Sequence, residues 1–417
     1  MSAHKRILLI AYHFPPLAGS SGIQRTLRFA QQLPQFGWQP LVLTASPRAY
    51  ERCDDSLSRE LPADLVVERA FAVDTARHLS FKGRYWGALA RPDRWMSWRF
   101  DAVRRGMAMI RRYQPQFIWS TYPIATAHQI GATLARRSGL PWIADFRDPM
   151  AQEDYPKDPQ VWQAFKAIEE EAFSLADHCV LTTPGATRQY RARYPQSKAQ
   201  VHCIENGYDE DSFPRELGTE GPLIPGCITL LHSGIVYPAE RDPSHLMQAL
   251  RRLHESGRIQ PGRLKLRFRA AVHNALLQRL AQEQGVSDYL ELAPAVPYRE
   301  ALAEMLRADG LLVMQDRGCN DQVPAKIYEY LRAGRPILAL TDPAGDTAGV
   351  LRGAGLDQIA ELDNASAIAT RLEQFLAAVQ RHDSALQPQA QAVQAASRLA
   401  RTQALAQLLD HSLKNRS

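Results

Sequence analysis

The stretch "VPAKIYEYLRAGRPILAL" (323–340) combines a helix with a strand that follows it directly. Pro324 suits the first turn of a helix, Gly334 ends it, and the apolar run 336–340 has the length of a buried strand. A helix that leads into such a strand is the repeating unit of a parallel sheet covered by helices. The same alternation is therefore expected in the rest of the chain.

Short apolar runs separated by helical patterns occur along most of the chain. The runs that fit strands are 6–12, 40–45, 117–121, 141–146, 179–183, 201–204, 228–234, 264–270, 310–315 and 336–340. The clearest helical patterns in the second half are 243–256, 274–284, 298–308 and 324–333. This alternation predicts an α/β protein with two Rossmann-like, doubly wound parallel-sheet domains that face a cleft.

One segment interrupts the alternation and marks the domain boundary. Residues 206–226, "NGYDEDSFPRELGTEGPLIPG", are rich in Gly, Pro and acidic residues, as interdomain linkers are. We predict a first domain at 1–208, a linker at 209–226 and a second domain at 227–385. The tail from 365 predicts two helices parted at Pro388, and the last segment, 386–417, is expected to pack back on the first domain.

Composition limits the class of protein. The 417 residues are 45% hydrophobic and 23% charged, and no apolar run has the roughly 18 to 20 residues that span a bilayer. The start, "MSAHKRILLIAYHFPP", lacks the features of a secretory signal, so we expect a cytoplasmic protein. The five cysteines form no close pair, and the net charge of +6 suggests an anionic partner.

Chemistry is expected in the loops that follow the strands, because ligands of open parallel sheets bind beyond the carboxyl ends of the strands. Four loops stand out: "AGSSG" with Gly19 and Gly22; "DFRDP" with Asp145, Arg147 and Asp148; 233–243 with Gly234 and Arg241; and 316–326 with Asp321 and Lys326. Glycines, carboxylates and cations together suit a phosphorylated ligand.

Lys326 lies in the first turn of its predicted helix, where a cation opposes the helix dipole at a cost of up to about 1 kcal/mol. Glu329 falls three residues later on the same face. The two side chains can form a surface pair worth only about 0.2–0.5 kcal/mol, or they can belong to a site for an anion.

Several segments resemble the large "group 1" (family 4-like) class of GT-B-fold glycosyltransferases, and the resemblance covers nearly the whole chain. The segments are "YHFPPLAGSSGIQRTLRFAQQLPQFGWQPLVLT", "STYPIATAHQIGATLARRSGLPWIADFRDP", "NGYDEDSF" and "VPAKIYEYLRAGRPILAL". The resemblance implies that the first domain is the acceptor side and that the second binds the nucleotide-sugar donor. It also implies that no metal and no cofactor are required, and that the sugar keeps its anomeric configuration.

The resemblance assigns roles in the second domain. Glu329 is expected to bind the ribose hydroxyls of the nucleotide, and Lys326 and Arg241 to stabilise the diphosphate beside Gly234. Asp321 takes the place of a glutamate that contacts the donor sugar in relatives.

The sequence differs from the family pattern at a second position, where a positive charge is missing. Ile235 stands where relatives often carry an arginine, so Lys326 or Arg317 is expected to supply the missing cation.

In the first domain the resemblance assigns His128 a place near the reacting sugar, although a histidine that only fills space in a helix fits the sequence equally well. Asp145, Arg147 and Asp148 are expected to line the cleft on the acceptor side, with a salt-bridged loop as the alternative. Gly19 and Gly22 are expected to let a ligand approach the backbone. The "DED" at 209–211 lies in the linker, so we predict no metal site there.

The segment 77–112 contains ten Lys or Arg, two Asp and three tryptophans. It predicts peripheral contact with an anionic membrane, at the inner face of the plasma membrane. No nucleic-acid-binding module is recognised, so nucleic acid is not an expected partner.

The sequence thus predicts a hexosyltransferase-type enzyme that moves a sugar from a nucleoside-diphosphate sugar to a lipid-linked or polysaccharide precursor. Such an enzyme would serve the biosynthesis of cell-surface polysaccharide. Two alternatives stay open: a nucleotide-sugar epimerase of the same fold, and a non-catalytic scaffold that binds a nucleotide sugar without turning it over.

Overall fold

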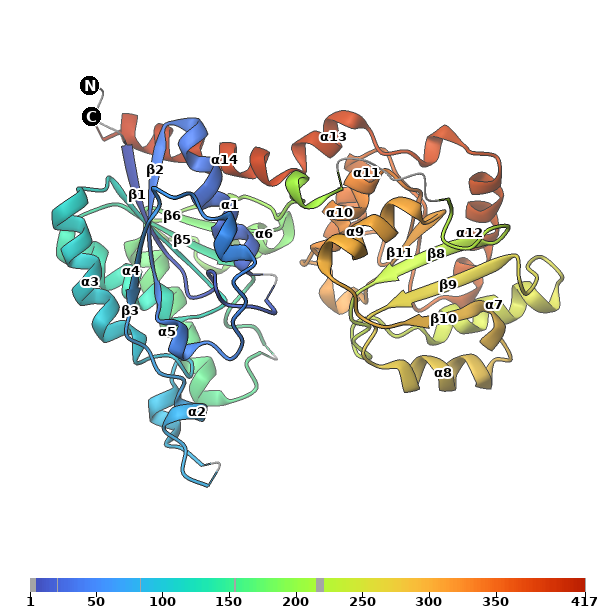
Figure 1. The fold of residues 1–417 in the computed structure, drawn as a ribbon, viewed down its shortest axis with the longest axis horizontal. Helices are drawn as coiled ribbons and strands as arrows, with labels where there is room; N and C mark the ends of the chain where they lie inside the picture. The colour runs from blue at the N-terminus through green and yellow to red at the C-terminus, as the bar shows by residue number, and fades with distance from the viewer. Residues whose placement is uncertain (1–4, 21, 83, 154, 215–220, 417) are drawn as a thin grey trace. The chain divides into compact units, whose positions relative to one another are not determined.

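The computed structural model describes residues 5–20, 22–82, 84–153, 155–214 and 221–416, and it divides the chain into two compact units (Figure 1). Unit 1 consists of Met1–Glu205 and Leu399–Ser417, and unit 2 of Asn206–Arg398. Each unit has its own parallel sheet, so the predicted α/β class with two doubly wound parallel-sheet domains is confirmed. Part of the predicted linker, 215–220, lies outside the described residues.

The sheet of unit 1 has seven parallel strands in the order β3-β2-β1-β4-β5-β6-β7. The strands are β1 (Lys5–Ile10), β2 (Trp38–Ala45), β3 (Val66–Ala70), β4 (Phe117–Thr121), β5 (Trp142–Arg147), β6 (His178–Leu181) and β7 (Gln200–Cys203). The strand order reverses between β1 and β4, and at this position a doubly wound sheet opens a crevice for a ligand.

Helices cover both faces of this sheet. They are α1 (Ile23–Gln32), α2 (Thr75–His78), α3 (Trp98–Tyr113), α4 (Thr126–Ser138), α5 (Pro159–Leu175), α6 (Pro184–Arg193) and α14 (Arg398–Lys414). One apolar core joins the sheet to α3, α4, α5 and α6, and a second joins the opposite face to α1 and α14. The strands between the two cores are buried on both sides, which explains their continuous apolar sequences.

The sheet of unit 2 has six parallel strands in the order β10-β9-β8-β11-β12-β13. The strands are β8 (Ile228–Ser233), β9 (Leu264–Arg269), β10 (Leu290–Ala293), β11 (Gly310–Met314), β12 (Ile337–Leu340) and β13 (Ile359–Ala360). The helices are α7 (Ser244–Glu255), α8 (Asn274–Glu283), α9 (Tyr298–Arg307), α10 (Lys326–Ala333), α11 (Asp346–Gly353), α12 (Ala365–Gln380) and α13 (Ala390–Ala395). The strand order reverses between β8 and β11.

The predicted strands agree with the structure to within two residues at each end, but β3, β10 and β13 were not predicted. The tail after 365 also differs from the prediction, because it forms α12, α13 and α14 rather than two helices. The break between α13 and α14 has a clear cause. The backbone of Tyr208 accepts a hydrogen bond from Arg398 and donates one to Ala396, at 2.8 and 3.1 Å.

Helix α14 is an integral part of unit 1, although α13 before it belongs to unit 2. Leu405 and Leu409 are fully buried against the sheet. Asp410 accepts hydrogen bonds from the ammonium of Lys5 at 2.6 Å and from the indole of Trp38 at 3.0 Å. The last helix therefore closes one face of the first sheet. None of the described helices combines the length and the apolar character needed to cross a bilayer.

We predict that Leu409→Ala lowers the free energy of unfolding of unit 1 by about 2–5 kcal/mol, because it leaves a cavity under α14. All seven tryptophans lie between residues 38 and 162 of the sequence, so tryptophan fluorescence during urea unfolding reports on unit 1. The control is Leu399→Ala on the same helix, at a side chain that is 42% exposed. It should change stability by less than about 0.5 kcal/mol. Equal effects of the two changes would contradict a structural role of α14.

Candidate functional site

The reversal of strand order in unit 2 brings two loops together. Strands β8 and β11 are hydrogen-bonded neighbours, and the loop after each one leaves from the same edge of the sheet. The loop after β8 begins at Gly234, and the loop after β11 runs into α10, which begins at Lys326. The helix is fixed to β8 by Tyr330, whose hydroxyl accepts a hydrogen bond from the backbone of Ser233 at 2.9 Å. These contacts place the start of α10 beside the end of β8.

A contact between Lys326 and His232 lies at the centre of this arrangement. The ammonium of Lys326 is 3.2 Å from Nε2 of His232, and Nδ1 of His232 is 3.0 Å from the carbonyl of Leu312. A carbonyl only accepts hydrogen bonds, so Nδ1 carries the proton and Nε2 accepts from Lys326. Burial lowers the pKa of His232 well below its ordinary value, so the ring is neutral. The imidazole thus orients the ammonium without neutralising its charge.

The positive charge at this point is not compensated. Burial and the nearby Arg241 guanidinium lower the pKa of Lys326 to about 7. Among the residues that the structure describes, no carboxylate lies within 4 Å of the Lys326 ammonium or the Arg241 guanidinium. Two cations and the amino end of a helix therefore meet without an ion-paired carboxylate, although Glu329 raises the pKa of Lys326 from a longer distance. This is the arrangement of an anion-binding site.

The loop after β8 has no side chain at Gly234, next to the Lys326 ammonium. Gly234 has φ of +106°, and a Cβ atom there would lie 3.4 Å from the Lys326 ammonium. The side chain of Arg241 folds back onto the same loop. Its guanidinium donates a hydrogen bond to the carbonyl of Ile235 and stacks on the ring of Tyr237, 5.1 Å from the ring centroid. A side chain at position 234 would be strained and would crowd the ammonium.

Glu329 lies one turn further along α10. Its carboxylate accepts a hydrogen bond from the hydroxyl of Tyr298 at 2.7 Å. Burial raises the pKa of Glu329, and the Tyr298 hydroxyl and the Arg398 guanidinium oppose that rise. Lys326 is not its hydrogen-bond partner, so the surface pair considered as the alternative does not form. The carboxylate keeps free acceptor capacity for the hydroxyl groups of a ligand.

The loop that carries Asp321 is held firmly at its base. The side-chain amide of Gln315 donates to the carbonyls of Cys319 and Gln322, both at 2.9 Å, and Thr347 donates to the second of these at 3.2 Å. Asp321 itself is exposed. The loop therefore presents a carboxylate to solvent from a fixed backbone.

The structure distinguishes the two cations that could replace an arginine at Ile235. Arg317 forms an ion pair with Asp363 at 2.8 Å. Lys326, in contrast, approaches the backbone of Gly234 next to Ile235. Lys326 is thus the cation placed beside the first loop of unit 2.

In unit 1 the loop after β1 forms a second polar cluster. Nδ1 of His13 is 3.1 Å from the Ser20 hydroxyl, and the Arg147 guanidinium lies 3.4 Å from the carbonyl of Gly22. A Cβ atom at Gly22 would lie 2.5 Å from His13 and 2.9 Å from Arg147, so only glycine fits. Burial and Arg147 lower the pKa of His13 to about 4. Gly19, at φ +80°, is exposed and shapes the loop.

The "DFRDP" loop separates its three charged residues. Asp145 is fully buried and forms a bidentate ion pair with Arg25, at 2.8 and 2.9 Å, which ties α1 to β5. The pairing of β5 with β6 shifts register between Asp145 and Arg147, and Arg147 has φ of +61°. Such a bulge redirects a side chain. Arg147 joins the His13 cluster, and Asp148 is exposed.

His128 is completely buried in the core of unit 1. Its Nδ1 lies 2.8 Å from the hydroxyl of Ser120, and its ring packs 4.8 Å from that of Phe146. Burial lowers the pKa of His128 to about 4, so the ring is neutral. In this position the side chain contributes to the core, as in the alternative that it fills space in a helix, and its role beside the sugar stays a prediction.

Three residues of these clusters were not predicted from the sequence: His13, His232 and Tyr298. His232 and His13 stand next to predicted glycine loops, and a histidine at the end of a buried strand was the available signal. Tyr298 lies 31 residues from Glu329 and gave no local signal. In the described part of the chain, no group of three or more His, Cys, Asp or Glu side chains is arranged to hold a metal ion.

Comparisons with known structures agree with this fold. Sucrose-phosphate synthase from Thermosynechococcus elongatus is 16% identical, with a TM-score of 0.67, and the match covers 99% of this chain and 100% of that one. HepE from Anabaena, in complex with UDP and glucose, is 14% identical over 98% and 100% of the two chains, with a TM-score of 0.64.

A Listeria monocytogenes protein described as a UDP-N-acetylglucosamine 2-epimerase is 11% identical over 99% and 97%, with a TM-score of 0.59. The shared architecture of two doubly wound sheets is that of GT-B proteins.

Residues 21–207 match the family model described as a glycosyl transferase 4-like domain. This part of the chain is therefore similar to glycosyl transferase 4-like domains, and the whole chain shares the two-sheet fold of the structures above. No curated protein sequence matches the chain.

We predict that Lys326→Met stabilises the protein in the absence of a ligand. The pKa of Lys326 is about 7 in the folded protein and 10.5 in its ordinary state, so the unfolded chain binds more protons between these values. The stability of the wild type therefore rises with pH across this window.

At pH 7 the variant should be more stable by about 1 kcal/mol, a value reduced by solvent screening, and the difference should vanish near pH 10. Thermal unfolding followed by circular dichroism measures it, with Lys157→Met at an exposed lysine as the control. A difference that is constant with pH would contradict the assigned protonation.

Proposed function

We propose that the enzyme transfers a sugar from a nucleoside-diphosphate sugar to a lipid-linked or polysaccharide precursor, without a metal ion and with retention of anomeric configuration. The observation that carries the proposal is the uncompensated pair of cations, Lys326 and Arg241, at the amino end of α10. Glu329 lies one turn further along the same helix. A nucleoside diphosphate has the matching pattern, with two phosphates followed by a ribose diol.

The same groups fit the chemistry of transfer. Departure of a nucleoside diphosphate builds negative charge on the phosphate oxygens while the sugar becomes oxocarbenium-like. Lys326, Arg241 and the backbone N–H groups at the start of α10 would stabilise that charge. His232 would hold the ammonium in place. The proposal assigns this charge stabilisation to protein cations, so it predicts activity in the presence of a chelator.

Glu329 would accept hydrogen bonds from the two ribose hydroxyls, while Tyr298 holds its carboxylate in position. Asp321, exposed on a fixed loop, would contact the hydroxyls of the donor sugar. HepE, of similar fold, is known in complex with UDP and glucose, which supports a nucleotide-sugar donor here.

In unit 1 the cluster of His13, Gly22 and Arg147 lies where the strand order reverses, and it would serve ligand binding on that unit. A lipid-linked acceptor would bring the enzyme to the inner face of the plasma membrane from the cytoplasm. Synthesis of cell-surface polysaccharide is the process that fits such an acceptor.

The first test is a calorimetric titration with UDP, GDP and ADP in the presence of a chelator. We predict that one nucleotide binds and that Glu329→Ala weakens its binding by about 10- to 100-fold, because hydrogen bonds to a charged group are lost. The matched control is Glu300→Ala, at an exposed carboxylate of α9. If no nucleotide binds at millimolar concentration, the donor site is not where we place it.

Turnover distinguishes the two alternatives. Consumption of the donor in the absence of an acceptor, with conversion to an isomeric nucleotide sugar, would favour an epimerase, a class with a structural relative here. Binding of a nucleotide sugar without consumption under any acceptor condition would favour a scaffold.

The depressed pKa of Lys326 gives a separate prediction. At pH 8 the amine is mostly neutral in the free protein, and a bound diphosphate raises its pKa, so binding should take up about one proton. Calorimetric enthalpies in two buffers of different ionisation enthalpy measure this uptake. Lys326→Arg keeps its charge at all these pH values and should take up none. Equal uptake by both proteins would show that another group titrates.

A further inference from the structure

The segment 75–92 extends from unit 1 as an arm between β3 and α3; Figure 1 shows α2 and the chain after it extending away from the sheet. The described part of this 75–92 arm exposes an unusual set of large apolar side chains. They are Leu79 (49% exposed), Phe81 (77%), Tyr85 (43%), Trp86 (80%) and Leu89 (40%). Together with Lys82 and Arg84 they line one open hollow. A contiguous apolar surface of this kind marks a site of interaction.

The charge of the arm has a single sign. Its sequence, "TARHLSFKGRYWGALARP", contains Arg77, Lys82, Arg84 and Arg91 and no Asp or Glu. Lys82 and Arg84 are exposed, and no carboxylate of the described residues lies within 4 Å of the charged groups of Lys82, Arg84 or Arg91. The arm therefore offers cations beside its aromatic rings.

The neighbouring helix α3 differs, although it belongs to the same basic stretch. Asp101 pairs with both Arg104 and Arg105, at 2.7 and 2.6 Å, and Arg105 also pairs with Glu68. The charges of Arg104 and Arg105 are therefore neutralised within the protein. The arm differs in that its cations lie beside several exposed aromatic rings and have no acidic neighbour on the arm.

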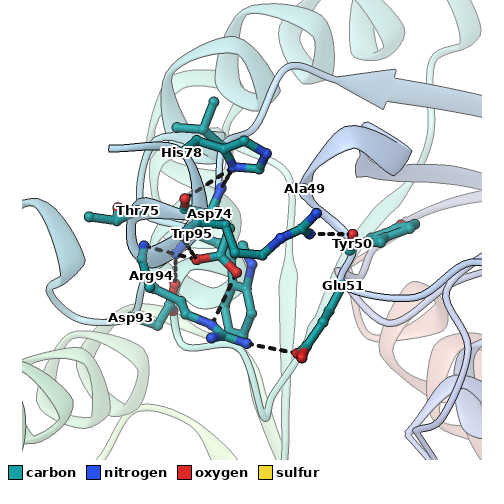
Figure 2. A network of polar contacts seen from close by, with 12 residues as sticks. Ala49, Tyr50, Glu51, Asp74, Thr75, His78, Asp93, Arg94 and Trp95 are labelled. Atoms are coloured by element: carbon teal, nitrogen blue, oxygen red, sulfur yellow. Dashed lines mark hydrogen bonds and ion pairs between the residues drawn. The ribbon is translucent and has the colours of Figure 1, made fainter. Parts of the chain in front are cut away.

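A network of polar contacts holds the base of the arm (Figure 2). Asp74 is fully buried and caps α2 by accepting from the backbone of Ala76 at 3.0 Å. The guanidinium of Arg94 lies 3.4 Å from Asp74 and 3.5 Å from Glu51, so it joins both ends of the arm to the body of unit 1. Backbone and side-chain bonds of Thr75, to Arg94 and Leu89 at 2.8 and 2.7 Å, close the base.

A second anchor lies on the far side of the base. The Asp93 carboxylate accepts from the backbone and the hydroxyl of Thr126, at 2.8 and 3.0 Å, at the start of α4. Hydrogen bonds and ion pairs thus anchor both ends of the arm to the body of unit 1. Such a base fixes the direction in which the apolar tip points.

We propose that the 75–92 arm inserts Phe81 and Trp86 into the interface of an anionic lipid bilayer, with Lys82 and Arg84 at the phosphate groups. Aromatic rings lie at the level of lipid headgroups, and nearby cations gain from an anionic surface. The absence of any acidic side chain on the arm favours an anionic surface over a second copy of this chain, whose surface carries both signs of charge. The inference rests on the membrane contact proposed above and names the surface that makes it.

The test is flotation of the full-length protein with vesicles at about 0.15 M salt, a condition that screens long-range attraction. We predict binding to vesicles of phosphatidylcholine mixed with phosphatidylglycerol and weaker binding to phosphatidylcholine alone. The double variant Phe81→Ser/Trp86→Ser should lower the partition coefficient at least about tenfold, since two large apolar side chains are lost. Lys82→Ser/Arg84→Ser should lower it about tenfold on the anionic vesicles only.

Two control variants lie on α3 in the same basic stretch. Phe100→Ser removes an aromatic ring that is 72% exposed, and Arg111→Ser/Arg112→Ser removes two exposed cations. Both should bind vesicles as the wild type does. All arm variants should retain wild-type tryptophan fluorescence transitions, corrected for Trp86, and wild-type nucleotide binding, so that a failure of the arm is separated from a failure of the donor site.

Three outcomes would overturn the proposal. The first is no binding of the wild type to anionic vesicles. The second is equal binding of the arm variants and the wild type, or a loss confined to the α3 variants. The third is a wild-type dimer in size-exclusion chromatography that the Phe81→Ser/Trp86→Ser change dissociates, because the apolar tip would then be an interface between copies of the chain.

Discussion

The contact between Lys326 and His232 is the interaction on which the candidate donor site depends. It joins the end of β8 to the start of α10, and it exists because strand order reverses between β8 and β11. The groups around it position a cation without an ion-pair partner: His232 is a neutral acceptor, Gly234 leaves room where a side chain would intrude, and Arg241 adds a second positive charge nearby. Such an arrangement costs stability in the free protein and is repaid when an anion binds.

In unit 1, in contrast to the donor site of unit 2, the main buried charges are paired with each other. Arg25 and Asp145 are both buried and form a bidentate pair, and the pair also receives a hydrogen bond from Thr121 at 2.9 Å. The two charges neutralise each other inside the fold, and their ion pair holds α1 against the sheet. Only Arg147, displaced by the bulge in β5, remains directed at the glycine loop. The contrast shows which charged motifs in this chain are structural and which are available to a ligand.

The sequence predicted the central strands well because they are buried on both faces and consist of continuous apolar runs. It missed β3, β10 and β13, which are edge strands of only five, four and two residues. Lys326 and Glu329 could be singled out because helical spacing is local. His232 and Tyr298 could not, since their contacts depend on which strands become neighbours and on how α9 packs against α10. Asp145 is a carboxylate of the kind found in binding sites, but only the structure shows that it is buried and paired with Arg25.

The pairing of Tyr208 with Ala396 and Arg398 means that the chain leaves unit 2 beside the point where it enters. Unit 1 is consequently assembled from two distant segments, and α14 is synthesised only after the whole of unit 2. At about 5–20 residues per second, translation of unit 2 takes roughly 10–40 seconds. During that time the apolar face of the first sheet that α14 will cover is still open to solvent, so unit 1 can complete its core only after unit 2 has been made.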